Sequence, residues 1–261
     1  MANMTSSVSA SQVAGELASA TFEEIPALVE HYREDPRQQV IKACERALKR
    51  HAKELAERER VNDMYELMHE LGGDGVVVGV EVGRGSVAGP LTVCAVCLPM
   101  EPRVWGINDS KKLTPARREL LSVKIAEVAT AIGFCHIAPK DIDEMGMARA
   151  IRTAVAGAVA DTGLEPDCVL MDGNPLGAVP NERDVVKGDA KIACIAAASI
   201  MAKVTRDEMM VEYDAEYPEY HLAESKGYAS PEHIEAIRKH GLCPLHRVSF
   251  CGNFLQTERL F

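Results

Sequence analysis

The sequence predicts an α/β fold in which helices flank a mixed central sheet, with a helical extension ahead of it. After residue 74, short β-branched runs alternate with helix-forming runs, an order typical of an α/β layer. Residues 36–70 are instead dense in Ala, Leu, Glu, Lys and Arg, with no Gly and no Pro beyond the first position. Hydrophobic residues make up 47% of the 261 residues, enough to bury the core of one large domain or two small ones.

The N-terminal region divides into two parts by composition. Residues 1–21 are rich in Ser and Ala, which predicts a disordered N-terminus. Residues 22–73 are expected to form a helical extension, since residues 36–70 favour one long helix or two. Its charge density is typical of a solvated appendage rather than a functional site. Three glycines within residues 72–75 indicate a hinge, so the second domain is expected at residues 74–261.

The second domain is expected to supply both layers of the fold. Strands are predicted at residues 76–82, 91–98, 134–138 and 168–171. Helices are predicted at residues 115–132, 147–161, 190–213 and 231–240, two of them with proline in the first turn.

Charge and hydropathy exclude some classes of protein. The net charge of −10 argues against binding nucleic acid by bulk electrostatics, although a local basic groove is compatible with it. Eight cations lie in or beside the unusual motifs: Arg84, Lys111, Lys112, Lys187, Lys203, Arg206, Lys226 and Arg247. No apolar run reaches the ~18 residues that a membrane span needs, and residues 1–20 lack the pattern of a signal peptide. A cytoplasmic protein without membrane attachment is therefore expected.

The eight cysteines are interpreted as reduced core residues, because most lie in apolar segments. Cys94 and Cys97 have the spacing of a zinc knuckle. They lie in a predicted strand, which would point them to opposite faces, and no second Cys/His pair follows at zinc spacing. A zinc site is therefore not expected.

A glycine-rich turn spans residues 83–90. It differs from a dinucleotide fingerprint, because its third glycine comes one position late and a strand follows instead of a helix. A phosphate-binding P-loop is also excluded, since no Gly-x-x-x-x-Gly-Lys-Ser/Thr run exists. The backbone can approach a ligand closely at Gly83 and Gly85, and Arg84 offers a planar donor group beside Glu81. The alternative is a tight hairpin turn without a ligand.

Three acids, Glu81, Asp172 and Asp189, each follow an apolar run. Carboxylates at neighbouring strand ends can converge on one crevice, and their oxygens suit hard cations such as Mg2+ or Mn2+. Two such ions can generate a hydroxide nucleophile and stabilise the leaving oxygen of a phosphodiester. Because Asp172 alone would more often be a turn residue, the set of three carries the hypothesis of a nuclease site.

Two other acids are interpreted as structural. Asp109 lies in a Lys-rich turn, where a role in helix entry or in bracing the loop is expected rather than catalysis. Asp207 follows Lys203 by four residues on a predicted helix, a spacing typical of a structural ion pair.

Seven motifs over residues 77–250 carry a family resemblance. They are Gly83-Arg84-Gly85-x-x-Ala88-Gly89-Pro90, Asn108-Asp109-Ser110-Lys111-Lys112-Leu113, Met171-Asp172-Gly173, Val186-Lys187-Gly188-Asp189, the run from Ala196 to Asp207, Lys226-Gly227-Tyr228, and His246-Arg247-x-Ser249-Phe250. With these motifs in this order, the chain resembles the ribonuclease HII family, the type 2 ribonucleases H.

The resemblance implies a ribonuclease H-like fold for residues 74–261 and an endonuclease that depends on Mn2+ or Mg2+. The implied substrates are RNA-DNA hybrids and duplex DNA containing ribonucleotides, cut on the 5′ side of the ribonucleotide to leave a 3′-hydroxyl and a 5′-phosphate. Such activity belongs to ribonucleotide excision repair, and a monomer is expected.

The resemblance also implies residue roles. Three acids correspond to catalytic metal ligands: Glu81, Asp172 and Asp189. Gly83, Arg84 and Gly85 correspond to the turn that contacts the ribose 2′-hydroxyl and a neighbouring phosphate, which fits the 2′-hydroxyl as the group that distinguishes RNA from DNA. Tyr228 corresponds to the ring at the RNA-to-DNA junction. Four lysines would contact backbone phosphates: Lys111, Lys112, Lys187 and Lys226.

One position departs from the family pattern. The family begins its first motif with an Asp-Glu pair ahead of a hydrophobic residue and the Gly-Arg-Gly turn, whereas this chain has Val80 before Glu81. Glu81 aligns with the Glu of the pair, and Val80 occupies the position of the Asp, which is a principal metal ligand in the family. Adjacent strand residues point to opposite faces, so Glu81 cannot fill both places. A natural loss, a rearranged site or a one-residue deletion are all compatible with the sequence.

The departure leaves an alternative function open. Weakened metal binding would make the chain a hybrid- or junction-binding homologue with little or no turnover. A third hypothesis is another two-metal phosphoryl-transfer enzyme on the same fold, which the Gly-Arg-Gly and Lys226-Gly227-Tyr228 motifs disfavour.

Overall fold

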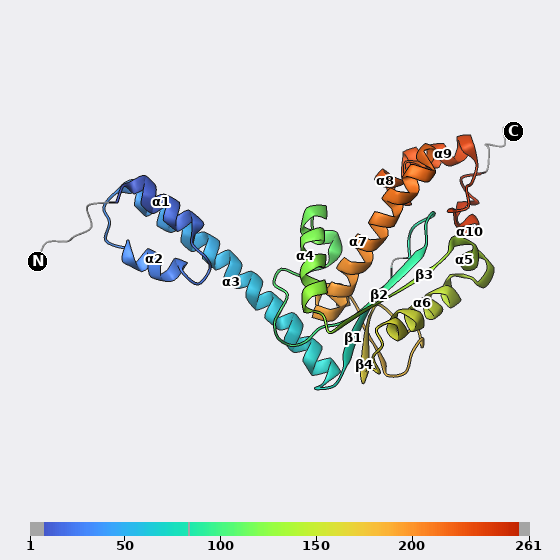
Figure 1. The fold of residues 1–261 in the computed structure, drawn as a ribbon, viewed down its shortest axis with the longest axis horizontal. Coiled ribbons are helices and arrows are strands. Elements are labelled where there is room, and N and C mark those ends of the chain that lie inside the picture. The colour runs from blue at the N-terminus through green and yellow to red at the C-terminus, as the bar shows by residue number, and fades with distance from the viewer. Residues whose placement is uncertain (1–7, 83, 256–261) are drawn as a thin grey trace, which may run out of the picture. The chain divides into compact units, whose positions relative to one another are not determined.

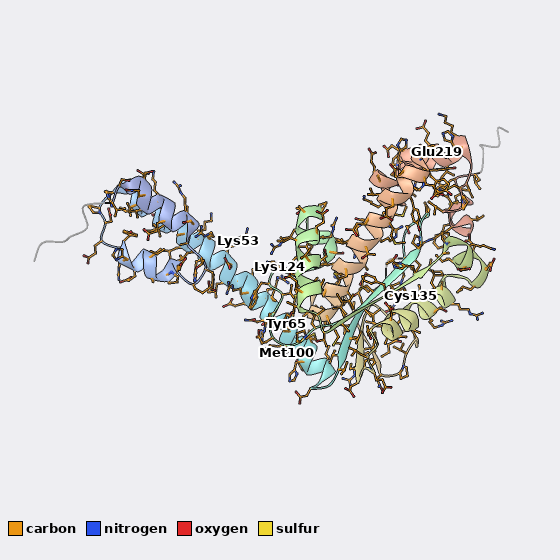
Figure 2. The ribbon with its side chains drawn as sticks, in the orientation of Figure 1. Lys53, Tyr65, Met100, Lys124, Cys135 and Glu219 are labelled. Atoms are coloured by element: carbon orange, nitrogen blue, oxygen red, sulfur yellow. The ribbon has the colours of Figure 1, made fainter. Side chains whose placement is uncertain are left out.

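The computed structural model describes residues 8–82 and 84–255. It divides into two compact units, Met1–Asn62 and Asp63–Phe261, and the division falls inside helix α3 (Gln38–Gly72). The sequence instead predicts a boundary after residue 73. The difference arises because the last turns of α3 pack with the second unit. There Tyr65 is fully buried and its hydroxyl accepts a hydrogen bond from the amide of Val104 at 3.0 Å (Figure 2).

The first unit is helical, and its order begins earlier than the sequence predicts. Helix α1 (Ala10–Ser19) lies within the segment expected to be disordered. A capping box between Ser9 and Gln12 starts the helix, and Val13 and Leu17, one turn apart, are buried. They pack in a small core with residues of α2 (Ile25–His31) and α3. The prediction of disorder was wrong here because it rested on the overall Ser/Ala content and not on the helical spacing of Val13 and Leu17.

The second unit contains a five-stranded mixed sheet, which confirms the predicted class of fold. Its strands are β1 (Val77–Val82), β2 (Leu91–Cys97), β3 (Ala131–Ile137), β4 (Cys168–Asp172) and β5 (Glu182–Val185). In the order β3-β2-β1-β4-β5, the first three strands are antiparallel neighbours, and β1, β4 and β5 are parallel. The parallel pairing of β1 with β4 brings the ends of these two strands together.

Helices cover both faces of the sheet, with α6 and α7 on opposite sides (Figure 1). The helices after α3 are α4 (Pro115–Val128), α5 (Pro139–Met145), α6 (Met147–Asp161), α7 (Ala193–Glu216), α8 (Leu222–Ser225), α9 (Pro231–His240) and α10 (Val248–Cys251). Short 3-10 turns lie at Ser110–Lys112, Gly188–Ala190 and Pro218–Tyr220. Helices α6 and α9 have the predicted bounds, whereas α4 ends four residues early because β3 begins at Ala131.

The two faces of β1 have different partners. Val78 and Val80 are buried in a core cluster that contains apolar residues of α6. Gly79 faces α7 so closely that a Cβ atom there would lie 2.4 Å from the carbonyl carbon of Cys194. Since side chains alternate along a strand, Glu81 lies on the α7 face.

The cysteines are free thiols, and five of the eight are buried. Cys94 and Cys97 are both buried within β2, three residues apart and therefore on opposite faces of the sheet. None of the helices within the described ranges is long and apolar enough to cross a membrane.

Candidate active site

Three acids, Glu81, Asp172 and Asp189, lie at the edge of the sheet where β1 and β4 end. Val80 pairs with Met171 in the parallel β1–β4 register, so Glu81 and Asp172 follow side by side on one face. The amide of Gly188 donates a hydrogen bond of 2.7 Å to Oδ1 of Asp172, which holds the 3-10 turn carrying Asp189 against the strand end. The structure thus brings the three predicted acids within electrostatic reach of one another.

Burial and like charge act on this acid cluster together. Burial, with smaller contributions from the charges of Asp172 and Asp189, raises the pKa of Glu81 to about 8. Oε2 of Glu81 is buried and accepts no hydrogen bond from the described residues. Asp189 is 6% exposed, and burial followed by the charge of Asp172 raises its pKa as well. The surroundings therefore disfavour the ionised forms of Glu81 and Asp189.

Lys111 supplies positive charge beside the cluster. Its Nζ lies 3.5 Å from Oδ2 of Asp189 and 4.0 Å from Oδ1 of Asp109. The Asp109 carboxylate also accepts a hydrogen bond of 2.9 Å from the Lys111 amide and so caps the 3-10 turn, which confirms the bracing role predicted for it. The ammonium group is mostly exposed, so it offsets the charge of the acids only in part.

The chemistry of these residues fits a hard divalent cation. Three carboxylates share the site, and the buried, unpaired oxygen of Glu81 is an acceptor without a donor. In the described part of the chain, no three His, Cys, Asp or Glu side chains already form a metal-ligand set. Glu81, Asp172 and Asp189 are the residues that would hold such a cation.

A cavity of about 110 Å³ contains both Glu81 and Tyr228 in its wall. Its lining comprises Glu81, Thr92, Ser110, Lys111, Ser199, Ala202, Lys203, Arg206 and Tyr228. The hydroxyls of Ser199 and Ser110 are hydrogen-bonded at 2.9 Å and link α7 to the turn of Lys111. The sequence singles out neither serine as a site residue, since both patterns also suit helix packing and turn capping.

The glycine-rich turn packs against the loop of Tyr228. Of its predicted site residues, Arg84 and Gly85 are exposed, and Gly83 lies outside the described residues. A Cβ atom at Gly85 would lie 3.9 Å from the ring of Tyr228, which is 43% exposed. The amides of Val87 and Ala88 donate hydrogen bonds of 2.9 and 3.1 Å to the carbonyl of Gly227. One carbonyl thus connects the turn with the Lys226-Gly227-Tyr228 loop.

Two buried arginines, Arg206 and Arg247, donate hydrogen bonds to backbone carbonyls of the glycine-rich turn. Arg247 is fully buried, and its guanidinium donates hydrogen bonds of 3.0–3.2 Å to the carbonyls of Arg84, Gly89 and Pro90. Its burial lowers its pKa to about 10. Neither arginine forms an ion pair with the described residues. Backbone carbonyls accept their hydrogen bonds, and the guanidinium carbons of Arg206 and Arg247 lie 5.7 and 5.8 Å from the ring centroids of Tyr228 and Phe250.

Arg206 joins the turn to the Tyr228 loop. It donates hydrogen bonds of 2.9 Å to the carbonyl of Ala88 and 2.7 Å to that of Lys226. Arg206 is adjacent to Asp207 in the sequence, but the observed ion pair joins Lys203 to Asp207 at 2.7 Å, which confirms the pair predicted from their spacing. The sequence contains no signal for either arginine's role, because their acceptors are main-chain carbonyls.

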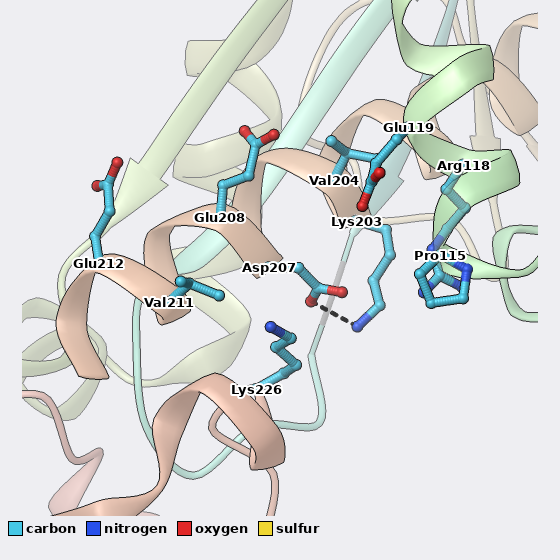
Figure 3. Close-up of a pocket in the computed structure, with 10 residues that line it drawn as sticks. All are labelled: Pro115, Arg118, Glu119, Lys203, Val204, Asp207, Glu208, Val211, Glu212 and Lys226. Atoms are coloured by element: carbon cyan, nitrogen blue, oxygen red, sulfur yellow. Dashed lines mark hydrogen bonds and ion pairs between the residues drawn. The ribbon is translucent and has the colours of Figure 1, made fainter. Parts of the chain in front are cut away.

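A larger cavity of about 590 Å³ lies between α4 and α7, next to the first. Lys203 lines both cavities. Figure 3 shows Lys203 and Lys226 on either side of Asp207, with Glu208 and Glu212 farther along α7. The lining of the larger cavity therefore includes the cations Lys203 and Lys226, and Lys203 also lines the smaller cavity that contains Tyr228.

Two other predicted lysines lie at exposed positions. Lys187 has left-handed backbone geometry, with φ of 58°, immediately before the turn that carries Asp189. Lys112 is exposed in the 3-10 turn beside Lys111.

Comparison with known proteins places these features in a family. The family model for ribonuclease HII matches residues 78–253, and that for the ribonuclease HII N-terminal domain matches residues 9–71. A ribonuclease HII of Ruminiclostridium cellulolyticum is 43% identical over 204 residues, which cover 77% of this chain and 80% of the relative. One from Acetivibrio thermocellus is 46% identical over 182 residues, or 69% and 71% of the two chains.

Solved structures agree in fold. The crystal structure of ribonuclease H2 from Pyrococcus horikoshii has a TM-score of 0.58 and 28% identity, covering 66% of this chain and 92% of that one. Bst-RNase HIII in complex with Mn2+ has a TM-score of 0.56 and 20% identity over 70% and 69% of the chains, which shows likeness of fold alone. The order of the strands, the acids at the ends of β1 and β4 and the extent of the matches lead to one conclusion: this chain belongs to the ribonuclease HII family of ribonuclease H endonucleases.

Proposed function

We propose that this protein cuts the RNA strand of RNA-DNA hybrids and the 5′ side of single ribonucleotides embedded in duplex DNA, leaving a 3′-hydroxyl and a 5′-phosphate. The observation that carries the proposal is the cavity shared by Glu81 and Tyr228. It joins the acid cluster to the loop that packs against the Gly-Arg-Gly turn. A phosphodiester at the acids would therefore have its sugar beside that turn.

Glu81, Asp172 and Asp189 would hold Mn2+ or Mg2+ in this proposal. The cations supply an activated water and stabilise the leaving oxygen when bound. The raised pKa of Glu81 supports this role, because a buried carboxylate among like charges gains from a cation. The crystal structure of Bst-RNase HIII, a protein of the same fold, in complex with Mn2+ is a precedent for Mn2+. Lys111 beside Asp189 would limit repulsion between the acids and an incoming phosphate.

The glycine-rich turn would recognise the ribose. Main-chain amides at Gly83 and Gly85 can approach a 2′-hydroxyl closely, since neither residue carries a side chain. The exposed guanidinium of Arg84 would bind a neighbouring phosphate, and the half-exposed ring of Tyr228 would stack at the junction. Lys111, Lys112, Lys187 and Lys226 would add phosphate contacts without sequence preference.

A second candidate function is binding without turnover, which is favoured by the absence of the first-motif Asp, with Val80 in its place. One experiment separates the two candidates. Cleavage and binding of a DNA duplex with one ribonucleotide would be compared with those of the same duplex without it, first in Mg2+ and then in Mn2+. The proposal expects a single ribonucleotide-dependent cut, which D189N reduces by about 100-fold or more. The exposed Glu165 offers a matched control, and E165Q should cut normally.

Each outcome has a definite meaning. Tight binding of the ribonucleotide duplex without a cut would select the binding function. Equal binding and equal cutting of both duplexes would overturn both candidates, because neither would then depend on the 2′-hydroxyl.

A further inference from the structure

Two buried imidazoles, His233 and His246, lie behind the backbone of Tyr228. His233 belongs to α9 and is fully buried, and His246 is 2% exposed. Nδ1 of His233 lies 2.8 Å from the carbonyl oxygen of Tyr228, and the Nε2 atoms of the two rings lie 3.1 Å apart. Neither histidine lines the cavity that contains Glu81 and Tyr228, so neither is placed to touch a substrate there.

The partners of the two rings determine which nitrogen of each neutral ring carries the hydrogen. A carbonyl oxygen only accepts, so His233 carries its hydrogen on Nδ1 and keeps Nε2 as an acceptor. His246 then donates from Nε2, and its bare Nδ1 accepts the amide of Cys243 at 3.0 Å. The donors thus run in one direction, from the Cys243 amide through both rings to the Tyr228 carbonyl.

This chain of hydrogen bonds requires both rings to be uncharged. An added proton would point a second donor at the Cys243 amide or at the other imidazole. Burial lowers the pKa of both rings, that of His246 to about 4, with the neighbouring His233 as a further cause. At neutral pH the pair is therefore an uncharged donor to the Tyr228 backbone.

The Tyr228 loop depends on such contacts, because its backbone is strained and its ring is loosely held. Lys226 has φ of 50°, a left-handed conformation that residues with a side chain rarely adopt. The Tyr228 ring is 43% exposed, and the cationic groups of Lys203 and Arg206 lie 5.5 and 5.7 Å from its centroid. The position of the ring is therefore set mainly through the backbone to which His233 donates.

The backbone around His246 is bonded to the glycine-rich turn. Ala88 and His246 form an isolated antiparallel bridge, and the amide of Arg247 donates a hydrogen bond of 2.8 Å to the carbonyl of Val87. The two imidazoles therefore connect the segment bonded to the glycine-rich turn with the backbone of Tyr228. Their contact sets the separation between the turn and this ring.

We propose that His233 and His246 are positioning residues for substrate selection: the neutral pair fixes the Tyr228 ring relative to the glycine-rich turn and so sets the preference for a ribonucleotide that is followed by DNA. This inference rests on the proposed function, in which Tyr228 stacks at the RNA-to-DNA junction. Neither imidazole touches the substrate or the metal.

Binding measured by fluorescence anisotropy in EDTA tests the inference on the full chain, since no strand is then cut. The junction preference is the Kd for a continuous RNA-DNA hybrid divided by the Kd for a DNA duplex with one ribonucleotide. H233F fills the same space without the Nδ1 hydrogen and should lower this preference about tenfold. The loss is partial because the Ser230 amide still donates to the Tyr228 carbonyl, at 2.8 Å. H233N keeps a donor near the Nδ1 position and should retain most of the preference, and H240F, at an exposed position of α9, should retain all of it.

A double mutant separates positioning of the ring from a general structural role. In Y228A, which lacks the ring, H233F should lower the preference no further, and additive losses would overturn the inference. A full preference in H233F would also overturn it but leave the proposed function standing. A parent that binds the ribonucleotide duplex and plain DNA equally would instead overturn the proposed function.

If H233F fails to fold, nitrogen-15 NMR of the histidines in the parent decides. At pH 7.5 the hydrogen should lie on Nδ1 of His233 and on Nε2 of His246. A bare Nδ1 in His233 would overturn the inference, because no donor would then face the Tyr228 carbonyl from this ring. H233N, which keeps the donor, supplies the matching measurement of the junction preference.

Discussion

Replacing Glu81 with glutamine should stabilise the metal-free protein at alkaline pH. Burial, aided by the charges of Asp172 and Asp189, raises the pKa of Glu81 from 4.5 to about 8. That difference corresponds to a cost of about 5 kcal/mol for ionising the buried group. Water entry and side-chain relaxation relieve part of this cost, so a gain on the order of 2–5 kcal/mol is expected in E81Q.

The sign follows from proton binding. Between pH 4.5 and about 8, folded Glu81 keeps a proton that the unfolded chain has released. The free energy of unfolding of the parent therefore falls as pH rises through this window and is lowest above it. The unfolding free energy of E81Q should still fall with pH, but less steeply, because the pKa of Asp189 is also raised.

Thermal unfolding with EDTA at pH 5 and pH 9 measures the effect. The Tm of E81Q should exceed that of the parent by about 5–15 °C at pH 9, with a much smaller difference at pH 5. E165Q, at an exposed position, should match the parent at both values. A Tm difference for E81Q that is the same at both pH values would refute the idea that ionisation of Glu81 is the cause. Added Mn2+ should raise the Tm of the parent more than that of E81Q.

Three further predictions concern the framework of the site. R247A should lose about 3–5 kcal/mol of unfolding free energy in urea, because it leaves buried carbonyls without donors, whereas R152A on an exposed face of α6 should lose almost none. G79A should cost about 2 kcal/mol or more through its clash with α7, while G15A, with open space around it, should be neutral or slightly stabilising; equal effects would argue against the close approach. Burial, with a neighbouring imidazole, lowers the pKa of His246 to about 4, so its contribution is present above pH 6.5 and is lost as pH falls toward 4. The difference in urea midpoint between pH 7.5 and pH 5 should therefore be smaller in H246Q than in the parent. An unchanged difference would show that another group causes the acid sensitivity.

Elements with strong local signals could be predicted, and those held by partners could not. Helix α9 begins with a Ser-Pro start and ends before a glycine, so both of its ends are visible in the sequence. Strand β5 was missed because three of its four residues are charged, and its pairing with β4 at the edge of the sheet sets its conformation. Helix α5 was missed because its seven residues are too few for a clear period.

The same distinction applies to the site. Glu81 and Asp172 could be paired in advance, since parallel strands end at the same edge of a sheet. The face on which Val80 lies depends on how β1 packs between α6 and α7, which no local pattern reports. Arg247 bonds to a carbonyl 158 residues away, and a main-chain acceptor leaves no trace in the residue type.

The glycine-rich turn and the Tyr228 loop are joined at two points. The carbonyl of Gly227 accepts hydrogen bonds from the turn, and Arg206 donates hydrogen bonds to both segments, so the two should move together. Substitutions in one of these segments should therefore change the effect of substitutions in the other, and their free energies should fail to add in double-mutant cycles. During evolution, a substitution in one segment would weaken its contacts with the other unless the other segment also changed. Any attempt to retune which sugar or junction this protein prefers has to vary both segments in the same library.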